Sequence, residues 1–408
     1  HLVTAAPCVS PFSRAGGISA LNCRLAAPLA VVAVGLSTAV NTGPASADTG
    51  RSGAAGHANA TRTKVSISAA PTVPVARIDA RVRVTGSITG NAGASRVTLQ
   101  RLHGRTWRTV AAAKVQKRRY AVPVPTGSAG MFTYRVGTLP GRGVPPVTSR
   151  PFSFAVGRGN PAAVGYLTHP PARWNPCAPI RYRVNLAGAP KGAAADIDRS
   201  IQQVAAASGL RFVRAGTSKV VPGSQGRDVL DDYDRDTELV IAYVAPGKGK
   251  GHSAYLPSRS QAVGVGGAFY TNATTKVRGA AWHQIVQGYL VLDRTKKLPG
   301  GFGAGHRYGL VGTWGQVIMH ELGHVAGLDH PRPADPAQIM YPSTTSKPAV
   351  WGAGDLVALR RVGAVSGCLS TPGVAGAAGA QGAEVSAPSL RGHDGLGRFD
   401  ASPLNHRR

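Results

Sequence analysis

The side chains with the clearest chemical potential lie in one eleven-residue stretch, HELGHVAGLDH, which runs from His320 to His330. His320 and His324 are four residues apart, so on a helix they share one face, about 6 Å apart along the axis, and both can reach one metal ion. Glu321 follows the first histidine and lies near the same ion without binding it, which suits a general base. The pattern therefore predicts a hydrolytic metal site.

Gly327 and His330 complete this pattern. A glycine can adopt a left-handed backbone conformation, end the helix and turn the chain so that His330 approaches as a third ligand. Three nitrogen ligands leave the fourth position of a tetrahedral zinc ion open, which is typical of a catalytic site. Apolar residues at helical spacing precede the motif, so we expect one helix over residues 313–326.

The motif resembles the HExxHxxGxxH signature of the metzincin metalloproteases. In that family a methionine in a tight turn lies beneath the zinc site. Met340 with Tyr341 directly after it, in the stretch QIMYP, is similar to the matrixin version of this turn. The resemblance implies one catalytic zinc ion and assigns the following roles. The ligands are His320, His324 and His330, the catalytic base is Glu321, and Gly327, Met340 and Tyr341 are structural residues of the site.

The resemblance covers roughly residues 165–368. Residues 173–184 are similar to the first matrixin strand, and residues 355–363 resemble the closing helix of that domain. Helices are expected at 193–208 and 355–362, and strands at 180–185, 210–213, 238–244, 262–270 and 287–293. The resemblance implies a matrixin-like protease domain over residues 165–371, with an α/β zincin fold.

The function that follows from this resemblance is that of a zinc metalloendopeptidase. Such an enzyme hydrolyses protein or peptide substrates through zinc-activated water, with Glu321 as the general base. Two alternatives remain open: a polyanion- or cell-wall-binding protein with an inactive zincin fold, and a zinc hydrolase acting on something other than peptides. The intact Glu321 favours an active enzyme, because an inactive site has no need of a base beside the metal.

Several features depart from the animal matrixins. No cysteine lies between Ala47 and Cys177, which excludes a thiol that blocks the zinc in a propeptide. The region that holds a second zinc in those enzymes offers only His252, so no structural zinc is predicted. His283 and His306 are isolated, and we expect them to be surface residues. Residues 228–238 (DVLDDYDRDTE) could bind calcium, although a solvated turn is the alternative that fits the spacing better.

The charge of the chain divides it into two parts. Lys and Arg number 47 against 18 acidic residues, which gives a net charge of +29 over 408 residues. No acidic residue lies between Asp79 and Asp196. From Asp196 to Thr371, with Asp196 included, there are 13 acidic and 19 basic residues. The basic part could bind an anionic cell-wall polymer, and nucleic acid without specificity. The alternative is that its charge merely reflects an Arg-rich composition.

The basic part also has its own secondary-structure pattern. Short runs of alternating apolar and polar residues, separated by Gly and Pro, recur over residues 63–157 and predict an all-β sandwich. This stretch resembles bacterial immunoglobulin-like accessory domains. The predicted fold class is therefore a multidomain protein, with an all-β sandwich followed by an α/β zincin (metzincin) catalytic domain.

The two ends of the chain differ from both parts. An apolar run over residues 25–40 follows Arg14 and Arg24 and precedes Ala45-Ser46-Ala47, which predicts a signal peptide over 1–47 and a secreted protein. The run is too short for a permanent membrane span, and the mean hydropathy of −0.06 excludes a polytopic membrane protein. Residues 48–62 are predicted to be a linker, and residues 372–408 a disordered tail.

Two of the four cysteines lie beyond the predicted leader. Cys8 and Cys23 would be removed with the signal peptide, which leaves Cys177 and Cys368. In an oxidising compartment these two are expected to form one disulfide. The alternative is a pair of buried free thiols.

Overall fold

The computed structural model describes residues 65–90, 93–139, 146–224, 230–256, 258, 262–307, 310–369 and 396–400. The predicted signal peptide and linker lie outside these residues, and so does the predicted tail except for residues 396–400. In the part of the chain that is described, no helix combines the length and the apolar character needed to cross a bilayer.

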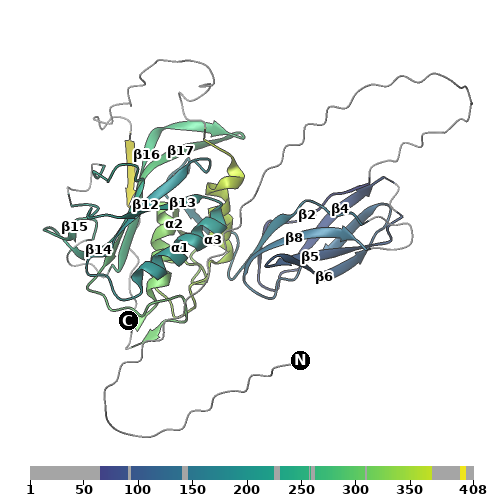
Figure 1. Ribbon diagram of the computed structural model, residues 1–408, viewed down its shortest axis with the longest axis horizontal. Coiled ribbons are helices and arrows are strands. Elements are labelled where there is room, and N and C mark those ends of the chain that lie inside the picture. Colours follow the sequence, from purple (N-terminus) through teal and green to yellow (C-terminus); the bar gives the residue numbers. More distant parts are fainter. Residues whose placement is uncertain are drawn as a thin grey trace, which may run out of the picture. The chain divides into compact units, whose positions relative to one another are not determined.

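The first part of the chain, residues 65–157, forms two β-sheets (Figure 1). One sheet has the order β1 (Ser66–Ile67), β4 (Arg83–Thr89), β2 (Ala70–Pro71), with β7 (Arg119–Pro123) also paired to β4. The other has the order β3 (Val75–Arg77), β9 (Phe152–Gly157), β8 (Gly130–Thr138), β5 (Arg96–His103), β6 (Thr106–Lys114). The alternating runs over residues 63–157 therefore form strands, as the pattern predicts.

Both sheets contribute side chains to one hydrophobic core, as in a β-sandwich. Val84 and Val122 from the first sheet pack in the same cluster as Leu99, Tyr134 and Phe154 from the second. All five are fully buried. The alternation of inward and outward residues along each strand places the apolar side chains in this core and the many arginines outside it.

The rest of the described chain, within residues 158–369 and at 396–400, is called here the C-terminal region. Its main sheet has the order β13 (Arg211–Thr217), β12 (Pro179–Asn185), β14 (Leu239–Pro246), β17 (Ala280–Asp293), β16 (Gly264–Val277), β21 (Leu396–Asp400). Strands β13, β12, β14 and β17 are parallel, and β16 is antiparallel to β17. Two short strands extend this sheet: β11 (Ala172–Arg173) pairs with β17, and β15 (His252–Ser253) pairs with β14. Two further sheets have two strands each: β10 (Val164–Tyr166) with β20 (Leu328–Arg332), and β18 (His306–Arg307) with β19 (Leu310–Val311).

Helices α1 (Ala193–Ser208), α2 (Trp314–Val325) and α3 (Ala353–Val362) accompany this sheet, and a 3-10 turn (Ala364–Ser366) follows α3. All three helices were predicted, within two residues at each end. Alternate residues of β14 enter different clusters: Ile241 packs with side chains of the helices, whereas Val240 packs with Tyr255 and Leu256 on the opposite face. The central strands are therefore buried on both faces, and α2 lies against the sheet.

The predicted α/β zincin class for residues 165–371 is wrong. Within the described residues of the whole chain, strands take 42% and helices 14%, with three α-helices, so the structure is mostly β. The expected strands at 262–270 and 287–293 are in fact β16 and β17, which have fourteen residues each. Small and polar residues between 271 and 286 hide the alternation, because such positions carry little hydrophobic signal. The C-terminal region is a β-rich structure with a mixed sheet.

One disulfide links the start and the end of this region. Cys177, just before β12, is bonded to Cys368, just after the 3-10 turn, with 5.4 Å between their Cα atoms. The predicted pairing is confirmed, and the alternative of two free thiols is excluded. Asn175 lies beside the link, where its side chain donates to the carbonyl of Leu369 at 3.0 Å.

Candidate metal centre

Helix α2 places the first two histidines. Its N-terminus is capped by Thr313, whose hydroxyl accepts the backbone N–H of Gln316 at 3.3 Å. Every residue of the helix is buried, so the histidines lie in the interior of the C-terminal region. His320 and His324 project from the same face, as the four-residue spacing predicts.

Gly327 ends this helix and reverses the chain. Its φ of +105° lies in the range that favours glycine, and a Cβ there would lie 2.3 Å from the carbonyl oxygen of Ala172. Strand β20 begins at the next residue and carries His330 to the two helical histidines. The predicted turn at Gly327 is therefore present, and any larger residue would displace the chain that holds the third histidine.

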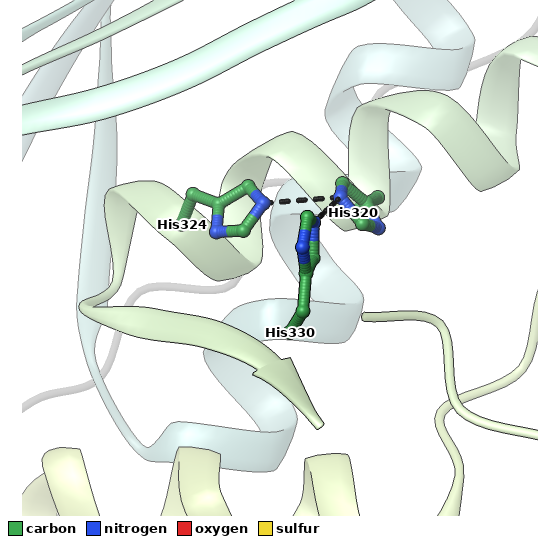
Figure 2. A group of neighbouring side chains, drawn as sticks. All are labelled: His320, His324 and His330. Atoms are coloured by element: carbon green, nitrogen blue, oxygen red, sulfur yellow. Dashed lines mark hydrogen bonds between the residues drawn. The ribbon is translucent and has the colours of Figure 1, made fainter. Parts of the chain in front are cut away.

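The three imidazole rings converge on one point (Figure 2). The Nε2 atom of His324 lies 3.0 Å from Nε2 of His320, and Nε2 of His330 lies 3.3 Å from the same atom. One nitrogen from each ring falls within 4.8 Å of the other two. Among the residues that the structure describes, this is the only group of three or more candidate metal ligands.

Backbone carbonyls fix which nitrogen of each helical histidine carries the proton. Nδ1 of His320 lies 2.7 Å from the carbonyl oxygen of Ile339, and Nδ1 of His324 lies 2.7 Å from that of Leu328. A carbonyl can only accept, so each Nδ1 holds a hydrogen and each Nε2 has a lone pair. Two lone pairs facing each other at 3.0 Å repel, and a cation between them removes that repulsion. The arrangement is thus preorganised for a metal ion.

Burial keeps these rings neutral, as metal ligands must be. Desolvation lowers the pKa of His320 to about 3, with a further contribution from His330 nearby. Desolvation likewise holds the pKa of His324 well below its ordinary value and lowers that of His330. Near neutral pH all three therefore offer lone pairs rather than positive charges.

The spacing of the nitrogens also matches the size of a zinc site. Zinc binds histidine nitrogen at about 2.0–2.1 Å in tetrahedral geometry, which separates two ligand atoms by about 3.3 Å. The observed Nε2 distances of 3.0 and 3.3 Å are close to this value. A metal ion fits the three histidines without a change of backbone, and three protein ligands leave a position for a substrate or water.

Glu321 lies next to the histidine cluster and is fully buried. Its Oε2 atom accepts the backbone N–H of Gly266, on β16, at 2.6 Å. The strand approaches the helix closely here: a Cβ on Gly266 would lie 2.1 Å from the carbonyl oxygen of Glu321, and one on Gly264 would lie 3.0 Å from its Cγ. The sequence did not reveal this role for the two glycines, because their contact with Glu321 joins segments that are distant in the chain and leaves no local pattern.

Met340 lies beneath the helix that carries the two histidines. A Cβ on Gly323 would lie 2.2 Å from the sulfur of Met340, so the thioether packs directly against the helix backbone. Both Met340 and the preceding Ile339, which orients His320, are buried. Tyr341 follows and is only half-buried. The resemblance assigned both Met340 and Tyr341 to the site. In the structure, Met340 packs against the helix that carries the two histidines.

Asp355 is a further residue of the site that the sequence analysis missed. It lies in the first turn of α3, is buried, and accepts backbone N–H groups from Ile339 at 2.6 Å, Gly352 at 2.9 Å and Met340 at 3.3 Å. Desolvation raises the pKa of this carboxyl to about 7. An acidic residue in the first turn of a helix usually caps that helix. The second role of Asp355, as acceptor for the backbone of Ile339 and Met340, therefore had no separate signal in the sequence.

Other residues that the sequence analysis considered as ligands lie elsewhere. Nδ1 of His252 contacts the carbonyl oxygen of Pro246 at 2.7 Å, and Nδ1 of His283 contacts that of Thr271 at 2.8 Å. His306 lies in β18, whose side chains are outside the described part. Three of the described carboxylates of 230–238 contact different partners. Asp231 accepts the hydroxyl of Tyr255, Asp234 that of Ser218, and Glu238 pairs with Arg181. This divergence gives no support to calcium binding.

Comparisons with known proteins add little to this description. No family model and no curated protein matches the chain. A chain in the solved structure titled "Structural basis of T cell specificity and activation by the bacterial superantigen toxic shock syndrome toxin-1" aligns at 8% identity over 22% of this chain and 98% of its own length, with a TM-score of 0.19. A similarity of this size carries no argument about fold or function.

Proposed function

We propose that this chain is a secreted zinc-dependent endopeptidase that cleaves protein or peptide substrates. The observation that carries the proposal is the convergence of three neutral imidazoles at metal-ligand distances, with Glu321 in the adjacent position of the same helix. The resemblance of this motif to the metzincins, together with Met340 beneath it, favours peptide bonds over other substrates.

The three histidines and the residues around them are suited to hydrolysis. Zinc, when bound, supplies a Lewis acid that polarises a carbonyl group and lowers the pKa of water towards neutrality. Glu321 accepts a proton from the attacking water and later delivers it to the leaving amine. The N–H of Gly266 holds one carboxylate oxygen of Glu321 in place, and burial limits competition from bulk water. The two helical histidines are oriented by carbonyls of Ile339 and Leu328.

The disulfide and the leader pattern support the secretion that we propose. The link between Cys177 and Cys368 forms and persists in an oxidising compartment. The apolar run at 25–40, with arginines before it and an Ala-x-Ala site after it, matches the pattern of an export signal for such a compartment.

A second function, binding of an anionic polymer, is favoured by the charge of the β-sandwich. Residues 80–157 contain thirteen Lys and Arg residues and no acidic residue. Every ion pair found among the described residues lies in the C-terminal region. Cations without acidic neighbours attract a polyanion without the need for specific contacts. This surface would tether the enzyme to a cell-wall polymer.

Zymography of the secreted protein, with and without a chelator, tests the proposed activity. We expect chelation to abolish hydrolysis and added zinc to restore it. Glu321→Gln keeps the three ligands, so it should bind zinc normally and lose at least about a hundredfold in kcat, as removal of a general base does. The matched control is Glu238→Gln, a partly exposed carboxylate that pairs with Arg181 outside the histidine cluster, and it should keep its activity. If Glu321→Gln retains activity within a few-fold, the proposed mechanism is wrong. If the wild-type protein binds zinc and cleaves no peptide, the result favours the alternative of a polymer-binding protein with an inactive metal site.

A further inference from the structure

Strand β16 has a neighbour on each side. Its inner neighbour is β17, and its outer neighbour is β21, which comes from the C-terminal segment of the chain. Residues Leu396–Asp400 pair antiparallel with Thr271–Gly267, in register from Leu396 opposite Thr271 to Asp400 opposite Gly267. In Figure 1 this segment is the yellow strand beside β16. The predicted tail thus contains a strand that completes the sheet.

The β16 edge leads directly to the metal centre. Gly266, whose N–H holds Oε2 of Glu321, is the residue next to Gly267, where the pairing with β21 ends. Gly264, two residues further, also lies against the Glu321 side chain. The strand that contacts the proposed base is therefore the strand whose outer edge is occupied by β21.

An open strand edge binds any extended peptide through backbone hydrogen bonds, largely independently of its side chains. A peptide that presents a bond to Glu321 passes close to Gly266, and the backbone groups available to it there belong to β16. The same groups, from Gly267 to Thr271, pair with β21. An extended substrate on this edge and β21 cannot occupy it together.

We propose that the segment Leu396–Asp400 is an intramolecular competitor that occupies the substrate-binding edge of β16. The proposal rests on the proposed peptidase function. The disulfide at Cys368 fixes the start of the connection, residues 370–395, to the body of the C-terminal region. A tether of this length makes docking intramolecular, with an effective concentration on the order of millimolar. The docked segment lowers the apparent affinity for substrate, and its release opens the edge.

Two truncated proteins test this proposal. One ends after Gly395 and lacks β21, and the matched control ends after Asp400 and keeps it. Amide hydrogen exchange reports the edge directly, because backbone N–H groups of β16 that bond to β21 become exposed. We expect faster exchange in residues 267–271 in the shorter protein alone. A segment that is docked nine-tenths of the time raises the apparent KM about tenfold, so the shorter protein should show a KM lower by about that factor, with kcat unchanged.

A synthetic peptide of residues 394–402, added to the shorter protein, provides an independent readout. It should bind, restore protection of residues 267–271 and compete with substrate. The same peptide with Arg398→Pro and Phe399→Pro lacks a ladder N–H and should not bind. Equal exchange in the two truncated proteins overturns the proposal, and so does faster exchange with an unchanged KM. If exchange and peptide binding respond as expected while no form cleaves any peptide, the occupant of the edge is correctly assigned and the proposed peptidase function is what fails.

Discussion

Asp355 and His320 are connected through a single residue, Ile339. The carboxylate of Asp355 accepts the backbone N–H of Ile339 at 2.6 Å, and the carbonyl of the same residue accepts the Nδ1 hydrogen of His320. Because a carbonyl oriented in this way fixes both the tautomer and the direction of the imidazole, α3 contributes to the metal centre without touching it. Asp355 is thus a positioning residue of the site.

Asp355→Asn tests this connection. The substitution keeps the shape of the side chain but replaces one of its two acceptor oxygens by an amide group, which cannot accept a hydrogen bond. The N–H groups of Ile339 and Gly352 share Oδ2 and that of Met340 contacts Oδ1, so one side of this support is lost in either orientation of the amide. Loss of an outer partner of a ligand typically weakens metal affinity about 10- to 100-fold. We expect that loss in zinc titrations against a competing chelator. Asp198→Asn, a half-exposed carboxylate paired with Arg214, should leave zinc affinity unchanged.

The candidate site was more predictable than the fold around it. The types and spacing of His320, His324 and His330 indicate a metal cluster because helical geometry and one glycine turn suffice to bring them together. Asp355 and Gly266 reach the same place through tertiary contacts between distant segments, which leave no local pattern. The predicted fold class was wrong because the long strands β16 and β17 contain small and polar residues, where the alternation of apolar and polar side chains is weak.

The stability of the metal-free protein should depend on pH through His320. Its pKa is about 3 in the folded protein and about 6.5 when the chain unfolds, because burial disfavours the charged form. Between these values the unfolded state binds the additional proton, so stability is lost as the pH falls below about 6.5. The slope from this one group approaches about 1.4 kcal/mol per pH unit. Urea unfolding in chelator, from pH 7.5 to 4.5, should show a shallower dependence for His320→Gln, and an equal dependence would contradict the assignment.

Asp355 contributes to the same profile with the opposite sign. Its pKa is raised from 3.8 to about 7 in the folded state by desolvation. Between these values the folded state binds the additional proton, so this contribution to stability is present at low pH and is lost as the pH rises through about 7. Asp355→Asn should therefore make the loss of stability below pH 6.5 steeper than in the wild-type protein. A shallower profile would show that the carboxyl stays ionised in the folded protein.

Gly266→Ala should separate β16 from α2. The new Cβ would lie 2.1 Å from the carbonyl oxygen of Glu321, so the strand must move and the hydrogen bond from Gly266 to Oε2 must lengthen. Overpacking of this kind typically costs about 1–3 kcal/mol. We expect that loss in urea unfolding and a fall in kcat at normal zinc content. Gly303→Ala is the matched control, because no atom lies within 4 Å of the position of its Cβ; a similar loss in both variants would exclude a local effect.

Removal of the disulfide should destabilise the C-terminal region. Cys177 and Cys368 are separated by 191 residues in sequence, and a link over such a loop restricts the unfolded chain by about 5 kcal/mol in the chain-entropy model. The double variant Cys177→Ser, Cys368→Ser should unfold at a correspondingly lower urea concentration than the oxidised protein. Reductant should shift the wild-type protein towards the variant and leave the variant unchanged. Peptide mapping of the unreduced protein should find the two cysteines in one fragment.

The cations of the β-sandwich should bind anionic polymers in a salt-dependent manner. Arg105, Arg108, Lys117 and Arg118 are exposed on this part of the chain, whose only described acidic residue is Asp79. Because the Debye length falls from about 10 Å at 0.1 M salt to about 3 Å at 1 M, the full-length protein should bind a polyanion column at low salt and elute well before 1 M.

Two quadruple variants decide whether the sandwich or the overall charge is responsible. Replacement of Arg105, Arg108, Lys117 and Arg118 by Gln removes four positive charges from the sandwich, and replacement of Lys248, Lys250, Lys297 and Arg211 removes the same number from the C-terminal region. Both variants have the same net charge, so a difference in elution reflects the position of the cations. We expect the first variant to elute at distinctly lower salt than the second. Equal elution of the two would mean that only net charge matters, and the sandwich would then have no tethering surface of its own.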